Sequence, residues 1–228
     1  VKAQVKDMIK VIFLADYKVS LAEMISPAAE ISEQIGKDGS VYRAEYEKLT
    51  AVIEKFFWDE EKGAYIDSFT SGRRNVTRHA NIFAILFSIA DEKQQEKILK
   101  NVLENDEIPA ITTPYFNFFE LDVLCRMGKL TEVLDKIRSY WGGMLDLGAV
   151  TFWEEYDPSV PKEEQYDMYG DHFGKSLCHA WAASPIYFLA KYFAGLDLVN
   201  KDGVTYILKP QMQYFTELDC TLPVGNNG

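Results

Sequence analysis

The chain has 228 residues, 47% of them hydrophobic and 14% aromatic, enough for one domain with a real core or for one domain and a fragment of another. A disordered chain would be neither this apolar nor this aromatic. The net charge of −11 repels phosphate backbones, and no apolar run is long enough to span a bilayer, so we expect neither nucleic acid nor a membrane as a partner.

The cysteines, histidines and glycines form none of the common motifs that bind metals or cofactors. The three cysteines, Cys125, Cys178 and Cys220, are far apart and odd in number, which predicts neither a disulfide framework nor a zinc ribbon. The three histidines lack the HxH or HExxH spacing of a zinc site. No GxSxG elbow, GxGxxG motif or P-loop is present. We therefore expect no metal and no cofactor.

Apolar residues recur at helical spacing through the first hundred positions. The predicted helices cover Val5–Phe13, Leu21–Ile25, Pro27–Gly36, Tyr46–Phe57, Arg78–Ala90 and Asp91–Leu103. Ser26 is a predicted N-cap, and Asp91 forms a predicted capping box with Gln94. An acidic turn, Asp59–Gly63, precedes a short piece at Ala64–Phe69 that we expect to be extended.

The second half continues the helices and then changes character. Further helices are predicted from Thr113-Pro114 to Gly128, from Thr131 to Gly142-Gly143, and over Gly174–Phe193 with a stop at Gly195. Gly148–Asp171, rich in Gly, Pro, Asp and aromatic residues, is predicted to be a long loop. Period-two alternation over Val204–Leu208 and Leu218–Leu222 predicts strands.

About eight successive helices joined by short loops, followed by a β tail, predict an all-α fold of antiparallel neighbours. No repeat of fixed period supports a TPR or HEAT array. An ordinary bundle and a ring of helix pairs, an α/α toroid, both fit this order of elements.

The densest group of polar and aromatic residues lies on the long loop. Three carboxylates, Glu154, Glu155 and Asp157, alternate there with Trp153 and Tyr156. Aromatic rings stack on sugars, and partial desolvation raises the pKa of a nearby carboxylate towards a catalytic range. A solvated acidic loop that Trp153 anchors to the core explains the same residues.

Three other segments offer candidate site residues. His179 and Trp181 are predicted at the start of an apolar helix, where His179 could orient a substrate or be an ordinary buried histidine. His79 follows Arg78 at another helix start, where polar groups cap the helix or face a cavity. Tyr115 lies in an aromatic run that suits sugar stacking or the core equally well.

Five segments, in this order and approximate spacing, resemble the bacterial α-L-rhamnosidases. They are Thr77–Asn81, Thr113–Phe116, Tyr140–Leu145, Gly148–Glu154 and Ser176–Trp181. Phe57-Trp58-Asp59 with Gly63-Ala64-Tyr65 also matches a turn of that family. The resemblance covers about residues 40–195.

The resemblance implies a fold and a reaction. It implies part of an (α/α)6 toroid of the six-hairpin glycosidase type over residues 1–197, and over 198–228 a linker and the first strands of a β-sandwich. It implies an inverting hydrolase that releases terminal α-L-rhamnose from glycosides or polysaccharides. Glu154 would be the general base and His179 would contact rhamnose. Trp153 and Trp181 would form the pocket wall, with Tyr115 and His79 as further substrate contacts.

The general acid of that family normally lies in an Asp/Arg/Glu-rich motif that these residues lack. Glu154 and Glu155 are adjacent, so their side chains diverge and make a poor acid–base pair. Eight helices are fewer than the twelve of a toroid, and the chain starts with Val1. We therefore expect the remainder of the catalytic domain upstream, leaving this chain by itself incomplete. The compartment stays open among periplasmic, secreted and cytoplasmic.

Two other functions remain open at this stage. One is a toroid glycosidase of another sugar specificity, although a carboxylated sugar would require more than the Lys175 and Arg78 found near the candidate site. The other is a degenerate toroid or carbohydrate-binding module without catalysis, which fits the missing acid.

Overall fold

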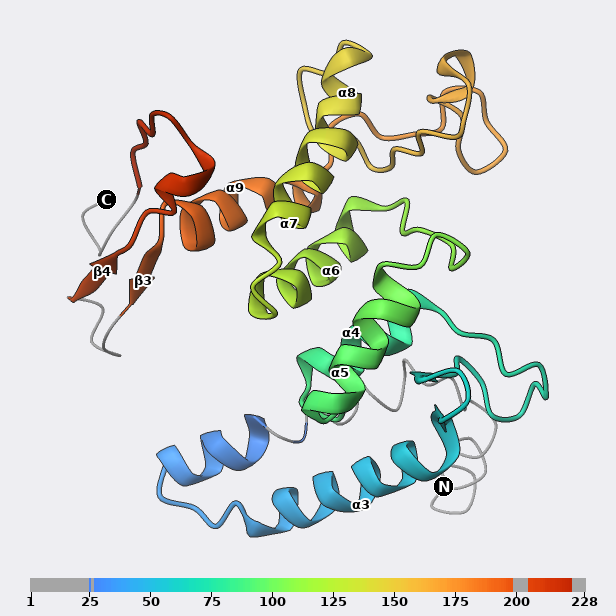
Figure 1. Ribbon diagram of the computed structural model, residues 1–228, viewed down its shortest axis with the longest axis vertical. Coiled ribbons are helices and arrows are strands. Elements are labelled where there is room, and N and C mark those ends of the chain that lie inside the picture. The colour runs from blue at the N-terminus through green and yellow to red at the C-terminus, as the bar shows by residue number, and fades with distance from the viewer. Residues whose placement is uncertain (1–24, 26, 199–204, 223–228) are drawn as a thin grey trace. The chain divides into compact units, whose positions relative to one another are not determined.

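The computed structural model of the protein describes residue 25 and residues 27–198 and 205–222. The predicted helix Val5–Phe13, most of the one at Leu21–Ile25, the cap at Ser26 and the strand position Val204 lie outside these residues. The chain divides into two compact units, Val1–Ala110 and Ile111–Gly228, which we describe separately (Figure 1).

The first unit is built on a long amphipathic helix. Helical residues 27–34 end near Gly36, whose φ of 73° suits glycine, and α3 (Ser40–Phe57) follows. Its buried side chains, Leu49, Ile53 and Phe57, recur every four residues along one face. Phe57 leads directly into β1 (Trp58–Asp59), which pairs antiparallel with β2 (Ala64–Tyr65). The predicted extended piece is therefore a strand only at its start.

Two further helices cover this hairpin. The helix α4 (Arg78–Leu86) is buried at seven of its nine positions, as its apolar sequence predicts. Asn81 joins it to β2, since its side chain accepts from the N–H of Tyr65 (2.8 Å) and donates to the same residue's carbonyl (2.9 Å). The predicted end at Ala90 is wrong: the helix stops at Leu86, and Ser88 has a φ of 57°.

The predicted capping box of Asp91 and Gln94 is confirmed. Asp91 accepts from the N–H of Gln94 at 2.8 Å, and the Gln94 side chain accepts from the N–H of Asp91 at 2.9 Å. The helix α5 (Glu92–Ile98) begins there and continues as the π-helical η1 (Leu99–Leu103). Its predicted end near Leu103 is also confirmed.

The second unit begins with the helix predicted at Thr113-Pro114. This helix, α6 (Pro114–Arg126), has proline in its first turn, and it packs against α7 (Leu130–Lys136) and α9 (Ser184–Phe188). Gly128 has a φ of 74° and ends it as predicted. The side chain of Thr113 makes no capping hydrogen bond, so the proline alone marks this start.

The predicted helix end at Gly142-Gly143 is wrong. The helix runs from α7 through the π-helical η2 (Ile137–Trp141) into α8 (Gly142–Asp146), and both glycines lie inside it. A β-carbon on Gly143 would lie 2.4 Å from the hydroxyl oxygen of Tyr156, so close packing against this ring requires the glycine. Gly148, with a φ of 91°, follows the actual end.

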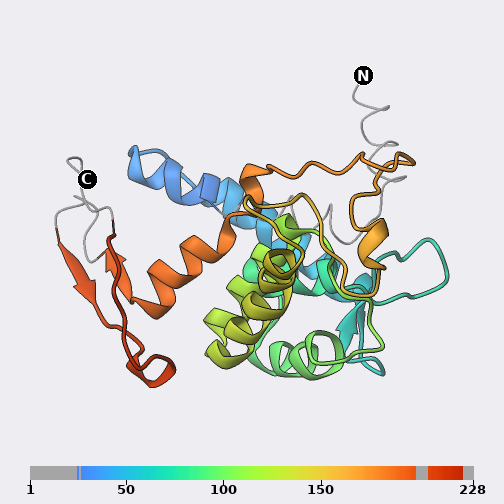
Figure 2. The ribbon, with the colours of Figure 1, turned by 90° about the horizontal axis from the view of Figure 1, so that it is seen from above.

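The long loop is confirmed and is longer than predicted. Residues 148–179 run out beyond the helices before returning towards α9, with one short 3-10 turn, η3 (Lys162–Glu164) (Figure 1, Figure 2). The predicted helix over Gly174–Phe193 is therefore wrong in its first ten residues. The 3-10 turn η4 (Ala180–Ala182) comes first, and α9 and the π-helical η5 (Leu189–Phe193) follow.

A β-hairpin follows the last helix. The strand β3 (Leu196–Leu198), which the sequence patterns missed, pairs antiparallel with β4 (Tyr206–Leu208), where a strand is predicted. The predicted strand at Leu218–Leu222 is wrong, because this segment has no strand pairing; a 3-10 turn, η6 (Met212–Tyr214), lies before it. Within the described ranges, no helix combines the length and apolarity that crossing a membrane requires.

Candidate active site

The long loop closes on itself by backbone pairing, and this brings the two main candidate residues together. The N–H of Glu154 donates to the carbonyl of Ser176 at 2.9 Å, and the N–H of His179 donates to the carbonyl of Phe152 at 2.8 Å. The hydroxyl of Thr151 donates to the carbonyl of Leu177. Residues 151–154 and 176–179 therefore lie side by side, although 25 positions separate Glu154 from His179.

Trp153 anchors this loop to the core. Its side chain is 3% exposed, and its ring lies 5.6 Å from the ring of Tyr166, centroid to centroid. Trp153 is thus buried, whereas Glu154 beside it is only partly buried and directs its carboxylate to Tyr169 and Ser176.

Both carboxylate oxygens of Glu154 accept hydrogen bonds. The hydroxyl of Tyr169 donates to Oε1 at 2.7 Å, and the backbone N–H of Ser176 donates to Oε2 at 3.0 Å. The Tyr169 bond, the Ser176 bond and the charges of His179 and Lys175 together lower the pKa of Glu154 below its ordinary value, against a smaller opposing effect of desolvation. The predicted rise of this pKa by aromatic surroundings is therefore wrong, because the donors outweigh burial.

The neighbouring carboxylates of Glu155 and Asp157 accept hydrogen bonds from other residues. Glu155 accepts from the hydroxyl of Thr112 at 2.9 Å. Asp157 closes a local turn by accepting from the N–H of Ser159 at 2.9 Å and from its hydroxyl at 2.7 Å. The divergence expected of Glu154 and Glu155 is thus present, and Glu154 alone of these three accepts from Tyr169 and Ser176.

An aromatic surface adjoins the Glu154 loop. The ring of His179 lies 4.3 Å from that of Trp181, and the ring of Trp181 lies 5.5 Å from that of Tyr115, which α6 carries in its first turn. Trp181 is 57% exposed and Tyr115 is 44% exposed. His179 and Trp181 lie on and beside η4, so their predicted place at the start of an apolar helix is wrong. Ser184-Pro185 starts that helix, with the proline in its first turn.

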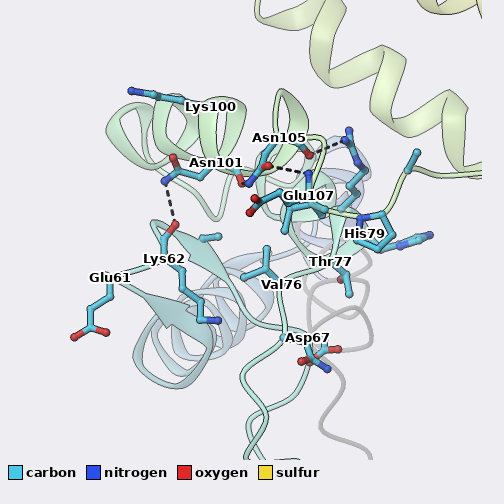
Figure 3. A pocket seen from close by; sticks show the side chains of 16 residues that line it. Glu61, Lys62, Asp67, Val76, Thr77, His79, Lys100, Asn101, Asn105 and Glu107 are labelled. Carbon is cyan, nitrogen blue, oxygen red and sulfur yellow. Dashed lines mark hydrogen bonds between the residues drawn. The ribbon is translucent and has the colours of Figure 1, made fainter.

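His79 belongs to the first unit, where it lines a cavity of about 920 Å³. Figure 3 shows Asn101 donating to the carbonyl of Lys62 and the Asn105 side chain accepting from the N–H of Glu107 beside this cavity. Arg78 is buried and donates to the carbonyl of Leu103 at 2.9 Å, which explains its place at the start of α4. Most of the residues that line the cavity are polar or charged.

Two residues that lower the pKa of Glu154 are connected to it by no motif or spacing rule. Tyr169 lies in the predicted loop, and Lys175 lies in the predicted helix Gly174–Phe193. Lys175 is buried, which lowers the pKa of its amino group by desolvation while Glu155, Asp157 and Glu154 oppose the change. The one usable signal is Gly170, because glycine marks turns. In the described part of the chain, no group of histidine, cysteine and acidic residues could hold a metal ion.

Residues 6–193 match the family model of the bacterial alpha-L-rhamnosidase 6 hairpin glycosidase domain. The chain belongs to this family. The predicted resemblance and the all-α, six-hairpin glycosidase fold class are thereby confirmed.

Two solved structures are similar to this member of the family. One is a rhamnosidase from Klebsiella oxytoca with rhamnose bound, with a TM-score of 0.68 and 28% identity over 78% of this chain and 34% of that one. The other is a GH78 family rhamnosidase of Bacillus sp. GL1, with a TM-score of 0.73 and 26% identity over 87% of this chain and 21% of that one. The chain thus spans about a third of the length of the first structure and about a fifth of the length of the second. A search of curated proteins found no match.

Proposed function

We propose that this chain supplies the general-base half of an inverting glycoside hydrolase that releases terminal α-L-rhamnose, with Glu154 as the base. The observation that carries the proposal is the carboxylate of Glu154, which accepts two hydrogen bonds and lies on a loop beside exposed aromatic rings. A depressed pKa keeps this carboxylate ionised, which is the state that accepts a proton.

The proposed step needs an unoccupied acceptor site on Glu154. An ionised carboxylate offers about four lone-pair sites, and Tyr169 and Ser176 occupy one on each oxygen. A water molecule can therefore donate to the carboxylate and, as Glu154 takes its proton, attack the anomeric carbon opposite the leaving group. The configuration inverts.

The leaving oxygen needs a proton from a second carboxylic acid on the other side of the sugar. In inverting enzymes, the two carboxyl groups lie about 6.5–9.5 Å apart to accommodate the water. Glu155 and Asp157 have the partners Thr112 and Ser159, so neither is proposed as the acid. We expect the acid in a part of the catalytic domain upstream of this chain.

The substrate contacts in the second unit are proposed for His179, Trp181 and Tyr115. A deoxy sugar such as rhamnose presents C–H groups and a methyl group, which pack on the exposed rings of Trp181 and Tyr115. His179 supplies a polar group beside those rings and can bond to a sugar hydroxyl. Trp153 is buried, and we assign it the role of holding the pocket wall from beneath.

His79 remains a proposed substrate contact through the polar cavity of the first unit. The proposed domain limits are 1–197 for the helical catalytic part and 198–228 for a linker and the entry to a β-sandwich. The rhamnose bound to the Klebsiella oxytoca protein supports the choice of sugar.

The proposal is tested by the stereochemistry of the product. Proton NMR would follow hydrolysis of an aryl α-L-rhamnoside by the full natural polypeptide that contains this chain, with aryl α-L-arabinoside and β-D-glucoside as comparison substrates. We expect β-L-rhamnose as the first sugar released and little turnover of the others. First release of the α anomer would contradict inversion, and rhamnose binding without turnover would favour a non-catalytic module.

A further inference from the structure

A tight turn in the long loop carries a side chain that does not suit it. Met168 and Asp171 exchange two backbone hydrogen bonds, of 3.0 and 2.9 Å, around Tyr169 and Gly170. Tyr169 has a φ of 55° and Gly170 a φ of 82°, the pattern of a type I′ turn. Asn, Asp and Gly favour both central positions of such turns, whereas a large side chain is strained there.

Packing does not explain the choice of tyrosine. The side chain of Tyr169 is 80% exposed, so burial of its ring offsets little of the backbone strain. Its hydroxyl donates to Oε1 of Glu154 at 2.7 Å, the short distance typical of a hydrogen bond to an ionised carboxylate. The strained position therefore places this hydroxyl group on the proposed base.

The rest of the loop fixes the turn in place. The N–H of Gly174 donates to the carbonyl of Asp171 at 3.2 Å, and a β-carbon on Gly174 would lie 2.2 Å from the carbonyl oxygen of Met168. Two residues further on, the N–H of Ser176 donates to Oε2 of Glu154. One short segment, residues 168–176, thus holds both oxygens of the same carboxylate.

We propose that Tyr169 is a positioning residue, whose hydroxyl fixes the orientation of the Glu154 carboxylate for the attacking water. This inference rests on the proposed role of Glu154 as the general base. An unheld glutamate side chain samples several rotamers, and a misplacement of about 1 Å in a reacting group can reduce the rate by about two orders of magnitude.

The charged and titratable groups around Glu154 make the effect of Tyr169 measurable as a change in the pKa of Glu154. Tyr169, His179 and Lys175 all favour the ionised carboxylate, and Glu155 acts on the hydroxyl of Tyr169. The hydrogen bond from Tyr169 is the largest cause of the lowered pKa of Glu154. Removing that hydroxyl therefore raises the pKa of Glu154, while His179 and Lys175 continue to favour ionisation.

Two substitutions separate the hydroxyl from the shape of the turn. Tyr169→Phe keeps the ring and the strained backbone, and Tyr169→Gly relieves the strain; both remove the hydroxyl. The control is Tyr187→Phe in α9 of the same unit, which removes a hydroxyl that accepts a hydrogen bond from Lys191 of η5. The pKa of Glu154 is measured by ¹³C NMR of labelled glutamate carboxyls, with Glu154→Gln identifying the signal. The rate is measured on an aryl α-L-rhamnoside with the full natural polypeptide.

We expect Tyr169→Phe and Tyr169→Gly to raise the pKa of Glu154, to move the acid limb of kcat/KM to higher pH, and to lower kcat on the order of tenfold. Tyr169→Phe is expected to lower the unfolding temperature slightly, because it keeps the strained backbone and loses the bond to the carboxylate, whereas Tyr169→Gly offsets that loss by relieving the strain. Tyr187→Phe leaves the pKa of Glu154, the acid limb and kcat unchanged. An unchanged pKa of Glu154 in both Tyr169 variants overturns the positioning role, whatever the activity. A shifted pKa together with full turnover by Glu154→Gln overturns the proposed function instead, because the contact then exists on a carboxylate that is not the base.

Discussion

Gly143 offers a direct test of how α8 packs against the long loop. It lies inside α8, and a β-carbon there would be 2.4, 2.5 and 2.6 Å from three atoms of the Tyr156 ring and hydroxyl. Ordinary contact begins at 3.4 Å, so the ring must retreat by about 1 Å. Tyr140 restricts that movement, because its ring lies 5.5 Å from that of Tyr156 and its hydroxyl accepts from the N–H of Tyr156.

Gly142 is the matched control for this substitution. A β-carbon on Gly142 would have no neighbour within 4 Å. Alanine at either position gains about 1 kcal/mol of helix propensity, so the difference between Gly143→Ala and Gly142→Ala isolates the overlap with Tyr156. Forcing an extra carbon into a packed site costs about 1–3 kcal/mol. We expect Gly143→Ala to be less stable than Gly142→Ala by that amount.

The assay is urea unfolding of both variants followed by tryptophan fluorescence, repeated in a Tyr156→Ala background. Removal of the ring should abolish the difference between the two alanine variants, which a double-mutant cycle expresses as a coupling energy. Equal stability of Gly143→Ala and Gly142→Ala in the Tyr156 background would refute the reasoning. A difference that survives in Tyr156→Ala would show that another neighbour is responsible.

Four further predictions concern stability, binding and pH. Trp153→Ala is expected to lower the free energy of unfolding by about 3–5 kcal/mol because the side chain is buried, as measured by urea unfolding. Trp181→Ala, at an exposed position, should leave stability within about 0.5 kcal/mol and instead weaken rhamnose binding in calorimetric titration. Asp91→Ala removes the capping box of α5 and should cost about 0.5–2 kcal/mol in thermal unfolding, whereas Asp91→Ser should retain most of the stability. Because the donors of Glu154 lower its pKa, kcat/KM should stay constant as the pH falls through the ordinary glutamate range and decrease only below it. The stability that ionised Glu154 contributes follows the same sign: it is present above the pKa of the unfolded state and is lost as the pH falls through the pKa of the folded state. An acid limb at or above the ordinary glutamate pKa would contradict this.

Features that depend on local chemistry were predictable from the sequence. The capping box of Asp91, the proline at the start of α6 and the glycine after its end each act through the backbone within one turn. The buried face of α3 follows equally from its spacing. Such signals need no knowledge of distant residues.

Features that depend on distant partners were not predictable. Gly142-Gly143 signals a helix end locally, yet the helix continues because Gly143 accommodates the ring of Tyr156. Residues 174–179 precede an apolar helical run and were predicted as its first turns, but their backbone groups pair with residues 152–154. This pairing is a contact across more than twenty positions, and no periodicity in the sequence reports it.

The same distinction applies to the candidate site. Motif order identified Glu154 and His179 as candidates, and their side-by-side placement came only from the backbone pairing of the loop. Tyr169 was missed because an exposed tyrosine in a glycine-containing turn is chemically ordinary until its hydroxyl is seen on Glu154. The direction of the Glu154 pKa shift was mispredicted for the same reason, since the donors that decide it lie 15 and 22 positions away.

The most direct test of Glu154 as the general base compares Glu154→Gln with Glu155→Gln on an aryl α-L-rhamnoside in the full natural polypeptide. The two substitutions are adjacent and chemically identical, but Glu155 accepts a hydrogen bond from Thr112 and has no proposed catalytic role. We predict that Glu154→Gln lowers kcat on the order of 10²–10⁴-fold with rhamnose binding retained, and that Glu155→Gln changes it less than tenfold. A kcat for Glu154→Gln within a factor of two of the unmodified enzyme would contradict the assignment.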